Sequence, residues 1–405
     1  MASPSSILWQ NDGKTVVLLD LPRSIEEAQV PSSALRAGDG RERREGSGGR
    51  DERAPTQLRR LVSELPPAAP FPTPEPKAGG SHLSAASPSA QLTELMTQAA
   101  VAAALDQIKQ SHDGPWCLPR ITSSPTPKPG AVKPPPLPPT PGPITDASPE
   151  SEPSSPPPPP EAPPGNPPAT VPDHDPSLYH LPPNSHPLPA TISPTCPPSL
   201  PPTAPAQFNL IVLDPPWPNR SAKRKRTGPG SYTPAPDLSS IRALLHNIPV
   251  ASRLAPGALV AVWVTNAARF ADLLTRPHAG GVFARWDVEL VGEWTWLKVT
   301  AAGEPVVALE SRWRKPWERL LIARKRGAAG GGPVEGKVIV SVPDVHSRKP
   351  NLRGLFEGLL PERHEALEVF ARNLTAGWWA WGDEVLLFQR KECWVDQSEE
   401  DERGA

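Results

Sequence analysis

The chain has 405 residues, and proline supplies 61 of them, about three times the usual share. Proline-rich stretches lack backbone donors and carry few large apolar side chains, which excludes a chain that folds along its whole length. The formal net charge is −1, and Cys117, Cys196 and Cys393 are too far apart for a disulfide scaffold or a Cys-x-x-Cys metal centre. No long apolar run or leader-type N-terminus is present, so we expect a soluble intracellular protein without a metal or a membrane partner.

The charge is unevenly distributed. Residues 206–395 carry 26 Lys and Arg against 18 Asp and Glu, whereas residues 1–205 carry 15 against 20 and the tail 396–405 is acidic. Eleven of the thirteen Trp also lie after Ala206. Residues 206–395 are therefore predicted to form the folded domain, and their basic surplus permits a polyanionic partner such as nucleic acid, although such a surplus is common.

The first thirty residues are predicted to form a β-hairpin followed by a short helix. Ser6–Gln10 and Lys14–Leu19 flank the turn trio Asn11–Gly13, and Ser24–Glu27 matches a capping box. An isolated hairpin is marginal in water, so we expect residues 1–30 to dock on the folded domain.

Residues 31–205 are predicted to be disordered and proline-rich, and deletion of 31–200 is expected to leave stability and activity nearly unchanged. The Ala-rich segment Gln91–Ser111 could form a helix. Its predicted apolar face comprises Leu92, Leu95, Met96, Ala99, Ala103 and Ile108. The tract that includes Pro156–Pro160 is interpreted either as a spacer, which is favoured, or as a ligand for SH3 or WW modules.

From Ala206 onward, apolar runs alternate with helical spacing. Phe208–Leu213 and Ala258–Val264 resemble strands buried on both faces, and Ser239–Asn247 and Asn266–Thr275 have helical spacing. Further predicted strands are Val288–Val299, Arg319–Arg324, Lys337–Val342 and Leu367–Ala371. This alternation predicts an α/β sheet with crossover connections.

The first apolar run ends in Asp214-Pro215-Pro216-Trp217, at the strand end where α/β sheets bind ligands. An exocyclic amine on an aromatic base is a poor nucleophile, because its lone pair is delocalised into the ring. The carboxylate of Asp214 and the carbonyl of Pro215 could each accept one of its N–H groups, and the two prolines would hold that carbonyl rigid. Trp217 could stack on the base. The alternative is an ordinary Pro-Pro turn with Trp217 in the core.

This tetrapeptide resembles the catalytic motif of the adenine-N6 methyltransferase family that includes the mRNA adenosine methyltransferase (MT-A type). Residues 206–395 are most similar to the methyltransferase-like protein four branch of that family. The segments that carry the resemblance are Trp217–Ser221, Ser231-Tyr232, Trp263–Asn266, Glu293–Lys298, Lys315–Glu318, His346–Pro350, Glu368–Leu374 and Gly377-Trp378.

The resemblance implies a Rossmann-like, S-adenosylmethionine-dependent methyltransferase with permuted motif order, in which the catalytic motif precedes the cofactor motif. It places Lys349 at the carboxylate end of the cofactor and Asp214 near its amino group. The strand that includes Glu368, Phe370 and Arg372 replaces the usual Gly-rich loop. Arg372 and Asn373 are implied to lie by the ribose, and Asp383 and Glu384 at the adenosine end. Asp383 departs from the family's usual Asn, which puts a donated contact to adenine in doubt.

The substrate side is implied to involve Trp217, Asn219, Lys223, Arg224, Tyr232 and Glu318. The basic run Lys223–Arg226 fits a phosphate contact, a nuclear localisation signal or a solvated loop, and we expect a nuclear protein. Gly327–Gly332 is interpreted as a surface loop rather than a phosphate loop.

The predicted activity is S-adenosylmethionine-dependent methylation of adenine N6 in nucleic acid. RNA is the favoured acceptor, with the 2′-O-methyladenosine of small nuclear RNA as one candidate. The alternatives are a DNA adenine methyltransferase and a non-catalytic, nucleic-acid-binding subunit. The presence of both Asp214 and Trp217 argues against the latter.

Overall fold

The structure is a computed structural model, and it describes residues 5–31, 58–72, 87–122, 176–193, 200–218, 235–276, 280–311, 314–327 and 331–395. The chain divides into two compact units, Met1–Thr122 with Asp175–Ala405, and Ser123–His174. All described residues belong to the first unit, and the fold given below is the fold of that unit. The tract Pro156–Pro160 lies outside the described residues.

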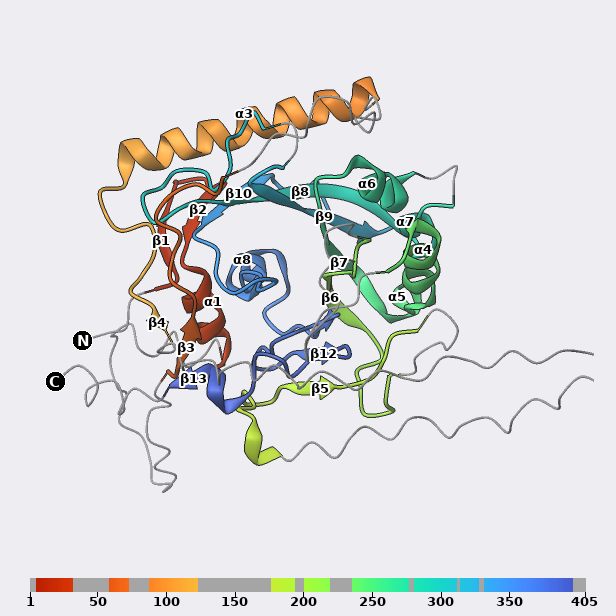
Figure 1. Cartoon of the computed structure of the whole chain (residues 1–405). Coiled ribbons are helices and arrows are strands. Elements are labelled where there is room, and N and C mark those ends of the chain that lie inside the picture. The colour runs from red at the N-terminus through yellow and green to blue at the C-terminus, as the bar shows by residue number, and fades with distance from the viewer. Residues whose placement is uncertain are drawn as a thin grey trace, which may run out of the picture. The chain divides into compact units, whose positions relative to one another are not determined.

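A ten-stranded sheet forms the centre of the fold (Figure 1). From edge to edge its strands are β1 (Ile7–Gln10), β2 (Val16–Leu19), β10 (Lys337–Ser341), β8 (Val288–Lys298), β9 (Trp317–Lys325), β7 (Leu254–Val264), β6 (Phe208–Leu213), β11 (Ala366–Val369), β12 (Trp379–Trp381) and β5 (His186–Leu188). Neighbours run parallel except where β1 meets β2 and where β9 meets β7 and β8. The predicted α/β class is confirmed.

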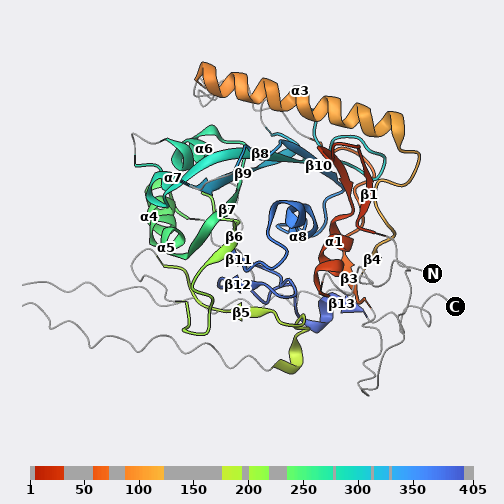
Figure 2. The same cartoon turned by 180° about the vertical axis from the view of Figure 1, so that it is seen from behind.

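Helices cover both faces of this sheet, which explains why its central strands are apolar on both sides. The helices α4 (Leu238–Asn247), α5 (Val250–Arg253), α6 (Ala268–Thr275) and α7 (Val282–Arg285) pack on the face that carries Ile211 and Leu213. The helices α1 (Leu21–Ala28) and α8 (Arg353–Phe356) pack on the face that carries Leu210 and Val212 (Figures 1 and 2). Within the described residues, short 3-10 helices lie at Pro176–Leu178, Glu357–Leu359 and Lys391–Cys393.

The sequence located the strands well because a continuous apolar run is a local signal. Phe208–Leu213 is β6 without a shift, and β7 starts at Leu254 rather than Ala258. Strand β11, which carries the cofactor-type motif, lies beside β6 although it follows β6 late in the chain. This placement agrees with the permuted motif order.

The N-terminal hairpin is part of the central sheet. Strand β2 pairs in parallel with β10, with Val16 opposite Val338, and all four residues of β2 are buried. The capping box predicted at Ser24 is wrong. Helix α1 begins at Leu21, because the Asp20 carboxylate accepts the Arg23 N–H at 2.9 Å and a proline occupies the first turn.

Parts of residues 31–205 are built into the fold, so disorder throughout that range is wrong. Strands β3 (Arg60–Ser63) and β4 (Ile121–Thr122) form a second sheet with β13 (Trp394–Val395), and β5 closes one edge of the central sheet. The 24-residue helix α3 (Pro88–Ser111) lies along β8 and β10 (Figure 1). The predicted boundary at residue 206 therefore does not separate folded from unfolded chain.

The predicted apolar face of α3 is also wrong, except for Ile108. Val101, Ala104, Leu105 and Ile108 are buried against β8 and β10, whereas Leu92, Leu95 and Met96 are 59 to 65% exposed. An Ala-rich helix carries two apolar stripes of similar strength, and only the position of the sheet selects between them.

No helix within the described ranges is long and apolar enough to cross a membrane. Within the same ranges, no three His, Cys, Asp or Glu side chains are grouped so that they could hold a metal ion.

Candidate active site

The Asp214 turn lies at the carboxyl end of β6, between the ends of β7 and β11. The Asp214 N–H donates to the Val369 carbonyl at 3.3 Å, which ties the turn to β11. The carbonyls of Pro215 and Pro216 accept the N–H groups of Trp217 and Ala235, at 2.8 and 2.9 Å. These bonds and the two fixed proline φ angles hold Asp214 in a rigid turn at the sheet edge.

Trp217 is a core residue rather than an open stacking face for a base. Its indole N–H donates to the Trp263 carbonyl at 2.7 Å, its ring lies 4.8 Å from that of Phe270, and the residue is 5% exposed. The structure therefore contradicts the predicted stacking role and favours the alternative reading of a core Trp. The side chain points inward because β7 provides a buried acceptor, the Trp263 carbonyl, and α6 provides an aromatic neighbour, Phe270.

Three charged side chains from three other parts of the chain form a cluster with Asp214. The Lys349 ammonium lies 3.3 Å from an Asp214 oxygen and 2.8 Å from a Glu318 oxygen. Lys298 approaches the other Glu318 oxygen at 2.5 Å. The result is an alternating chain of charges, Asp214–Lys349–Glu318–Lys298, in which each inner group has two partners of opposite sign.

The surroundings keep Lys349 and Glu318, the two inner members of this row of charges, ionised. Burial works against a charge on Lys349, but Asp214 and Glu318 outweigh it and raise the pKa of the ammonium. Burial likewise works against a charge on Glu318, but Lys298 and Lys349 outweigh it and hold the pKa of this carboxyl below its usual range. Trp263 and Trp296 flank the ammonium of Lys349, with ring centroids at 5.5 and 6.0 Å.

A small cavity of about 20 Å³ lies beside Lys349, on the α8 side of the sheet. Three residues predicted to bind the cofactor line it, namely Lys349, Glu368 and Asn373, and Trp263 and Trp378 form apolar walls. The side chain of Glu368 makes no hydrogen bond or ion pair with the described part of the chain. Burial, and then the nearby Asp214 carboxylate, raise its pKa to about 8. A buried carboxylate without a cation fits a ligand that brings its own ammonium or hydroxyl groups.

The backbone after β11 is arranged for close approach. Phe370 adopts a left-handed conformation, with φ at 60°. A side chain at Gly382 would put its Cβ 3.2 Å from the Phe370 Cα, so only glycine lets β12 come this near. Beyond this point, Arg372 pairs with Glu384 at 2.9 Å, which brings together two of the predicted cofactor residues.

Asp383 faces the loop that follows β5. Burial raises its pKa, while hydrogen bonds from the Thr191 side chain and the Ile192 N–H act in the opposite direction. The Asp383 carboxylate therefore accepts from this loop, as an Asn oxygen would, and nothing in the structure explains the departure from the family's Asn. A contact from Asp383 to adenine stays a prediction.

The structure unites Asp214, Glu318 and Lys349, and it places Glu368 and Asn373 on the adjoining cavity. Asn219, Lys223, Arg224 and Tyr232 lie outside the described residues. Their predicted contacts, like the proposed nuclear localisation and SH3 or WW binding, stay predictions.

Two residues beside the site were missed. Lys298 holds Glu318, as described above. Asn266 donates to the Trp317 carbonyl at 2.5 Å, and its buried Oδ1 has no hydrogen-bond partner among the described residues. Both lie in segments that carried the family resemblance, which was the only available signal.

An α/β sheet with Asp-Pro-Pro-Trp at the end of a central strand, opening on a charged cavity, defines a methyltransferase-type site. The MT-A70 family model matches residues 208–384. The N6-methyladenosine RNA methyltransferase MTA1 of Cryphonectria parasitica is 44% identical over 96% of this chain and 94% of its own length. The chain therefore belongs to the MT-A70 family, whose methyltransferases use S-adenosylmethionine in general.

Two further relatives show how the similarity is distributed. The protein of the same name from Pyricularia oryzae is 45% identical over 96% of each chain. The human N(6)-adenine-specific methyltransferase METTL4 is 36% identical, over 46% of this chain and 39% of its own length. The two fungal relatives thus match both the N-terminal elements and the methyltransferase domain.

Proposed function

We propose that this protein transfers a methyl group from S-adenosylmethionine to the N6 amine of adenine in RNA. The observation that carries the proposal is the position of Asp214, in a rigid turn between a charged cluster and a cavity lined by Lys349 and Glu368. RNA is preferred over DNA because the two relatives that match almost the whole chain are named RNA methyltransferases.

The cofactor supplies a methyl group that is already activated on a sulfonium. The chain's own residues therefore have to position the adenine amine against that methyl group and remove water from between them. The Asp214 carboxylate accepts one N–H of the adenine amine, and the Pro215 carbonyl is the expected second acceptor. These contacts draw the nitrogen lone pair out of the ring and aim it at the methyl group. The nitrogen would take the methyl group as the donor leaves as a neutral thioether, and the extra amine proton would pass to the Asp214 carboxylate that accepts the N–H.

The cavity residues hold the donor's polar ends. Lys349 would face its carboxylate, and Glu368 lies where a carboxylate can accept from an ammonium or a hydroxyl. Arg372 and Asn373 would lie by the ribose. Trp263 and Trp378 form apolar walls of the cavity.

The proposal is tested by competition between an RNA and a DNA oligonucleotide of the same sequence, with S-adenosylmethionine as donor. Nucleoside mass spectrometry is expected to find N6-methyladenosine in the RNA. Methylation confined to the DNA would show that DNA, not RNA, is the acceptor. Binding of both oligonucleotides without any methyl transfer would indicate a non-catalytic subunit.

Replacing Lys349 with Ala should raise the KM for S-adenosylmethionine more than it lowers kcat. The ammonium would contact the donor's carboxylate, away from the transferred methyl group, so its contribution is nearly the same in the ground state and the transition state. Steady-state kinetics with varied cofactor measure both constants. Lys337→Ala is the matched control, because Lys337 also packs on a Trp ring, at 5.4 Å, but lies outside the site. A full loss of kcat with unchanged cofactor binding would contradict the role of Lys349.

The stability of the unliganded protein should fall with rising pH because of Glu368. Burial and Asp214 raise the pKa of this carboxyl in the folded state from 4.5 to about 8. The folded state therefore binds this proton more tightly than the unfolded chain does. The resulting stabilisation is complete below pH 4.5 and is lost as pH rises through about 8.

Thermal melts from pH 5 to 9 should show this loss in the wild type, and a smaller one in Glu368→Gln, which cannot ionise. Parallel curves for the two proteins would show that Glu368 titrates normally.

A further inference from the structure

The segment that carries Lys349 is held by side chains and backbone groups that are far away in sequence. We call residues 342–349, between the end of β10 and Pro350, the Lys349 loop. Its Ser347 is left-handed, with φ at 73°, a conformation that a non-glycine residue keeps only when its surroundings impose it. The Arg348 N–H donates back to the Val345 carbonyl at 3.0 Å, which closes a tight turn just before Lys349.

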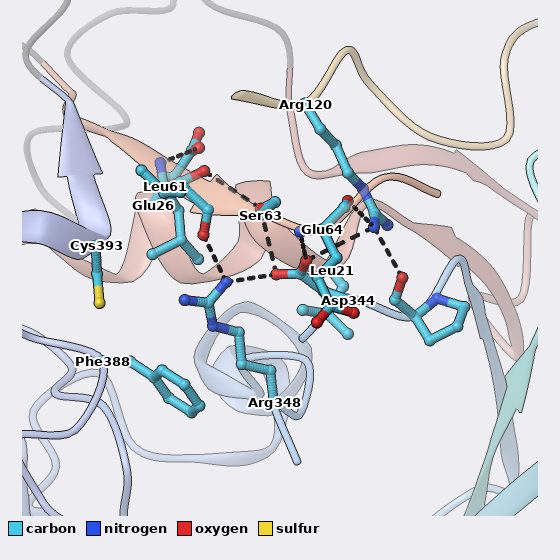
Figure 3. Close-up of polar contacts among 12 residues, drawn as sticks. Leu21, Glu26, Leu61, Ser63, Glu64, Arg120, Asp344, Arg348, Phe388 and Cys393 are labelled. Atoms are coloured by element: carbon cyan, nitrogen blue, oxygen red, sulfur yellow. Dashed lines mark hydrogen bonds and ion pairs between the residues drawn. The ribbon is translucent and has the colours of Figure 1, made fainter. Parts of the chain in front are cut away.

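Asp344 is the centre of the contacts that hold this loop (Figure 3). Its carboxylate is fully buried and accepts from the Ser63 hydroxyl at 3.2 Å and from the Glu64 N–H at 2.9 Å. Arg348 lies 2.7 Å from one of its oxygens, and Arg120 lies 3.6 Å from the other. A buried carboxylate with two guanidinium partners and two neutral donors has a well-defined position.

The two arginines connect the loop to chain far away in sequence. The Arg120 guanidinium donates to the carbonyls of Val342, Pro343 and Glu64, at 2.9, 2.8 and 3.0 Å. The Arg348 guanidinium donates to the Val62 carbonyl at 2.8 Å and lies over the Phe388 ring at 4.5 Å. Residues 62–64 and 120 are therefore the outer support of the Lys349 loop, and all of them lie outside the 208–384 family match.

This support is itself anchored to the N-terminal helix. The Glu26 carboxylate accepts the Leu61 N–H at 2.8 Å, and the helix cap Asp20 accepts the Leu118 N–H at 2.8 Å. A set of hydrogen bonds thus runs from α1 through Leu61 and Val62 of β3 to Arg348. The next residue is Lys349, whose ammonium lies on Asp214 and Glu318.

We propose that Arg120 and Asp344 are positioning residues for the methyl donor. They hold the Lys349 loop in the one conformation that directs Arg348 to the N-terminal segments and Lys349 to the cavity. The N-terminal elements would then set cofactor affinity from outside the methyltransferase domain. This inference rests on the proposed function, because it takes Lys349 as the group that binds the donor's carboxylate.

The first test is a double-mutant cycle on cofactor binding by the full-length chain, measured by calorimetry with S-adenosylmethionine. Arg120→Met removes the donors while keeping much of the side-chain length. We expect it to raise the Kd for S-adenosylmethionine about tenfold in the wild-type background, since a displaced Lys349 ammonium loses most of its contribution to cofactor binding. In the Lys349→Ala background the same change should raise the Kd less than about twofold, because the group on which it acts is missing.

The matched control is Arg353→Met. Arg353 is another buried arginine that donates to backbone carbonyls, those of Glu27 and Val30 at 2.6 and 2.7 Å, but it does not touch the Lys349 loop. It should lower the melting temperature without the increase in Kd. An equal increase for Arg353→Met, or an Arg120→Met effect that is fully additive with Lys349→Ala, would overturn the proposal. If Arg120→Met does not fold, Arg120→Lys is measured in the same cycle, and it should show a smaller increase with the same non-additivity.

The second test needs no cofactor. Hydrogen exchange of the free protein, followed by mass spectrometry, should show faster exchange in a peptide covering 342–349 for Arg120→Met and Asp344→Asn, with β6 and β7 unchanged. Unchanged exchange in this peptide would overturn the proposal. A wild-type protein that binds S-adenosylmethionine but methylates no adenine would overturn the proposed function alone, since neither test depends on methyl transfer.

Discussion

Asp214→Ala should reduce the methyl-transfer rate at saturating S-adenosylmethionine by about a hundredfold or more, while the protein stays folded. One of the two acceptors that aim the amine is lost, and the removal of a single such group typically costs ~3 kcal/mol in the transition state. The fold should survive because Lys349 keeps its second partner, Glu318, at 2.8 Å. Single-turnover transfer to an adenine-containing RNA, with a melting curve and a cofactor titration, measures the rate, the folding and the cofactor saturation.

Asp272→Ala is the control for this change. Asp272 also pairs with a cation, Arg276 at 2.7 Å, but on the exposed surface of α6. Its loss should leave the rate unchanged. Turnover near the wild-type level in Asp214→Ala would remove the basis of the proposed mechanism, whatever the outcome for the cofactor-binding residues.

Replacing residues 87–122 with a flexible Gly-Ser linker should abolish stable folding. Helix α3 buries Val101, Leu105 and Ile108 against the sheet, and burial of three large apolar side chains contributes about 5–9 kcal/mol. The same replacement removes Arg120 and its bonds to the Lys349 loop. The free energy of unfolding of a typical domain is only about 5–15 kcal/mol, so the burial free energy lost with α3 is comparable to the whole stability of the domain. Circular dichroism and soluble yield measure the outcome.

This result would reverse the expectation from sequence that residues 31–200 can be deleted at little cost. Deletion of 130–170 is the control, because it removes none of the described contacts. It should leave the melting temperature within about 2 °C of the wild type. A linker variant that melts like the wild type would show that α3 and β4 are not needed for the fold.

The Asp214 turn could be located from sequence because its signals are local. A continuous apolar run marks a buried strand, and a ligand site at its carboxyl end follows from how α/β sheets bind ligands. The roles of Lys349 and Glu318 came from the family resemblance alone. Their meeting with Asp214 joins β6, β9 and the Lys349 loop, and no spacing along the chain encodes such an encounter.

The errors share one physical cause. Trp217 was predicted to stack on a base, and the exposed stripe of α3 was predicted to be the buried one. In both cases the correct orientation depends on which part of the fold packs against the residue, and the local sequence does not contain this information. Likewise, proline-rich composition hid β3, β4 and the packing of α3 on the sheet, because their few apolar and charged side chains become stabilising only against an existing sheet. Low average hydrophobicity predicts disorder for an isolated segment, not for one that completes another element's core.

Strand periodicity and a turn motif act over a few residues, so the class of fold and the positions of the central strands along the chain could be predicted from sequence, and the role of Asp214 stays a prediction. The tertiary structure alone decided which face of α3 is buried, that Trp217 anchors the turn from inside, and that Arg120 and Asp344 support the Lys349 loop. These are long-range contacts, and their energy exists only once the sheet has brought the partners together.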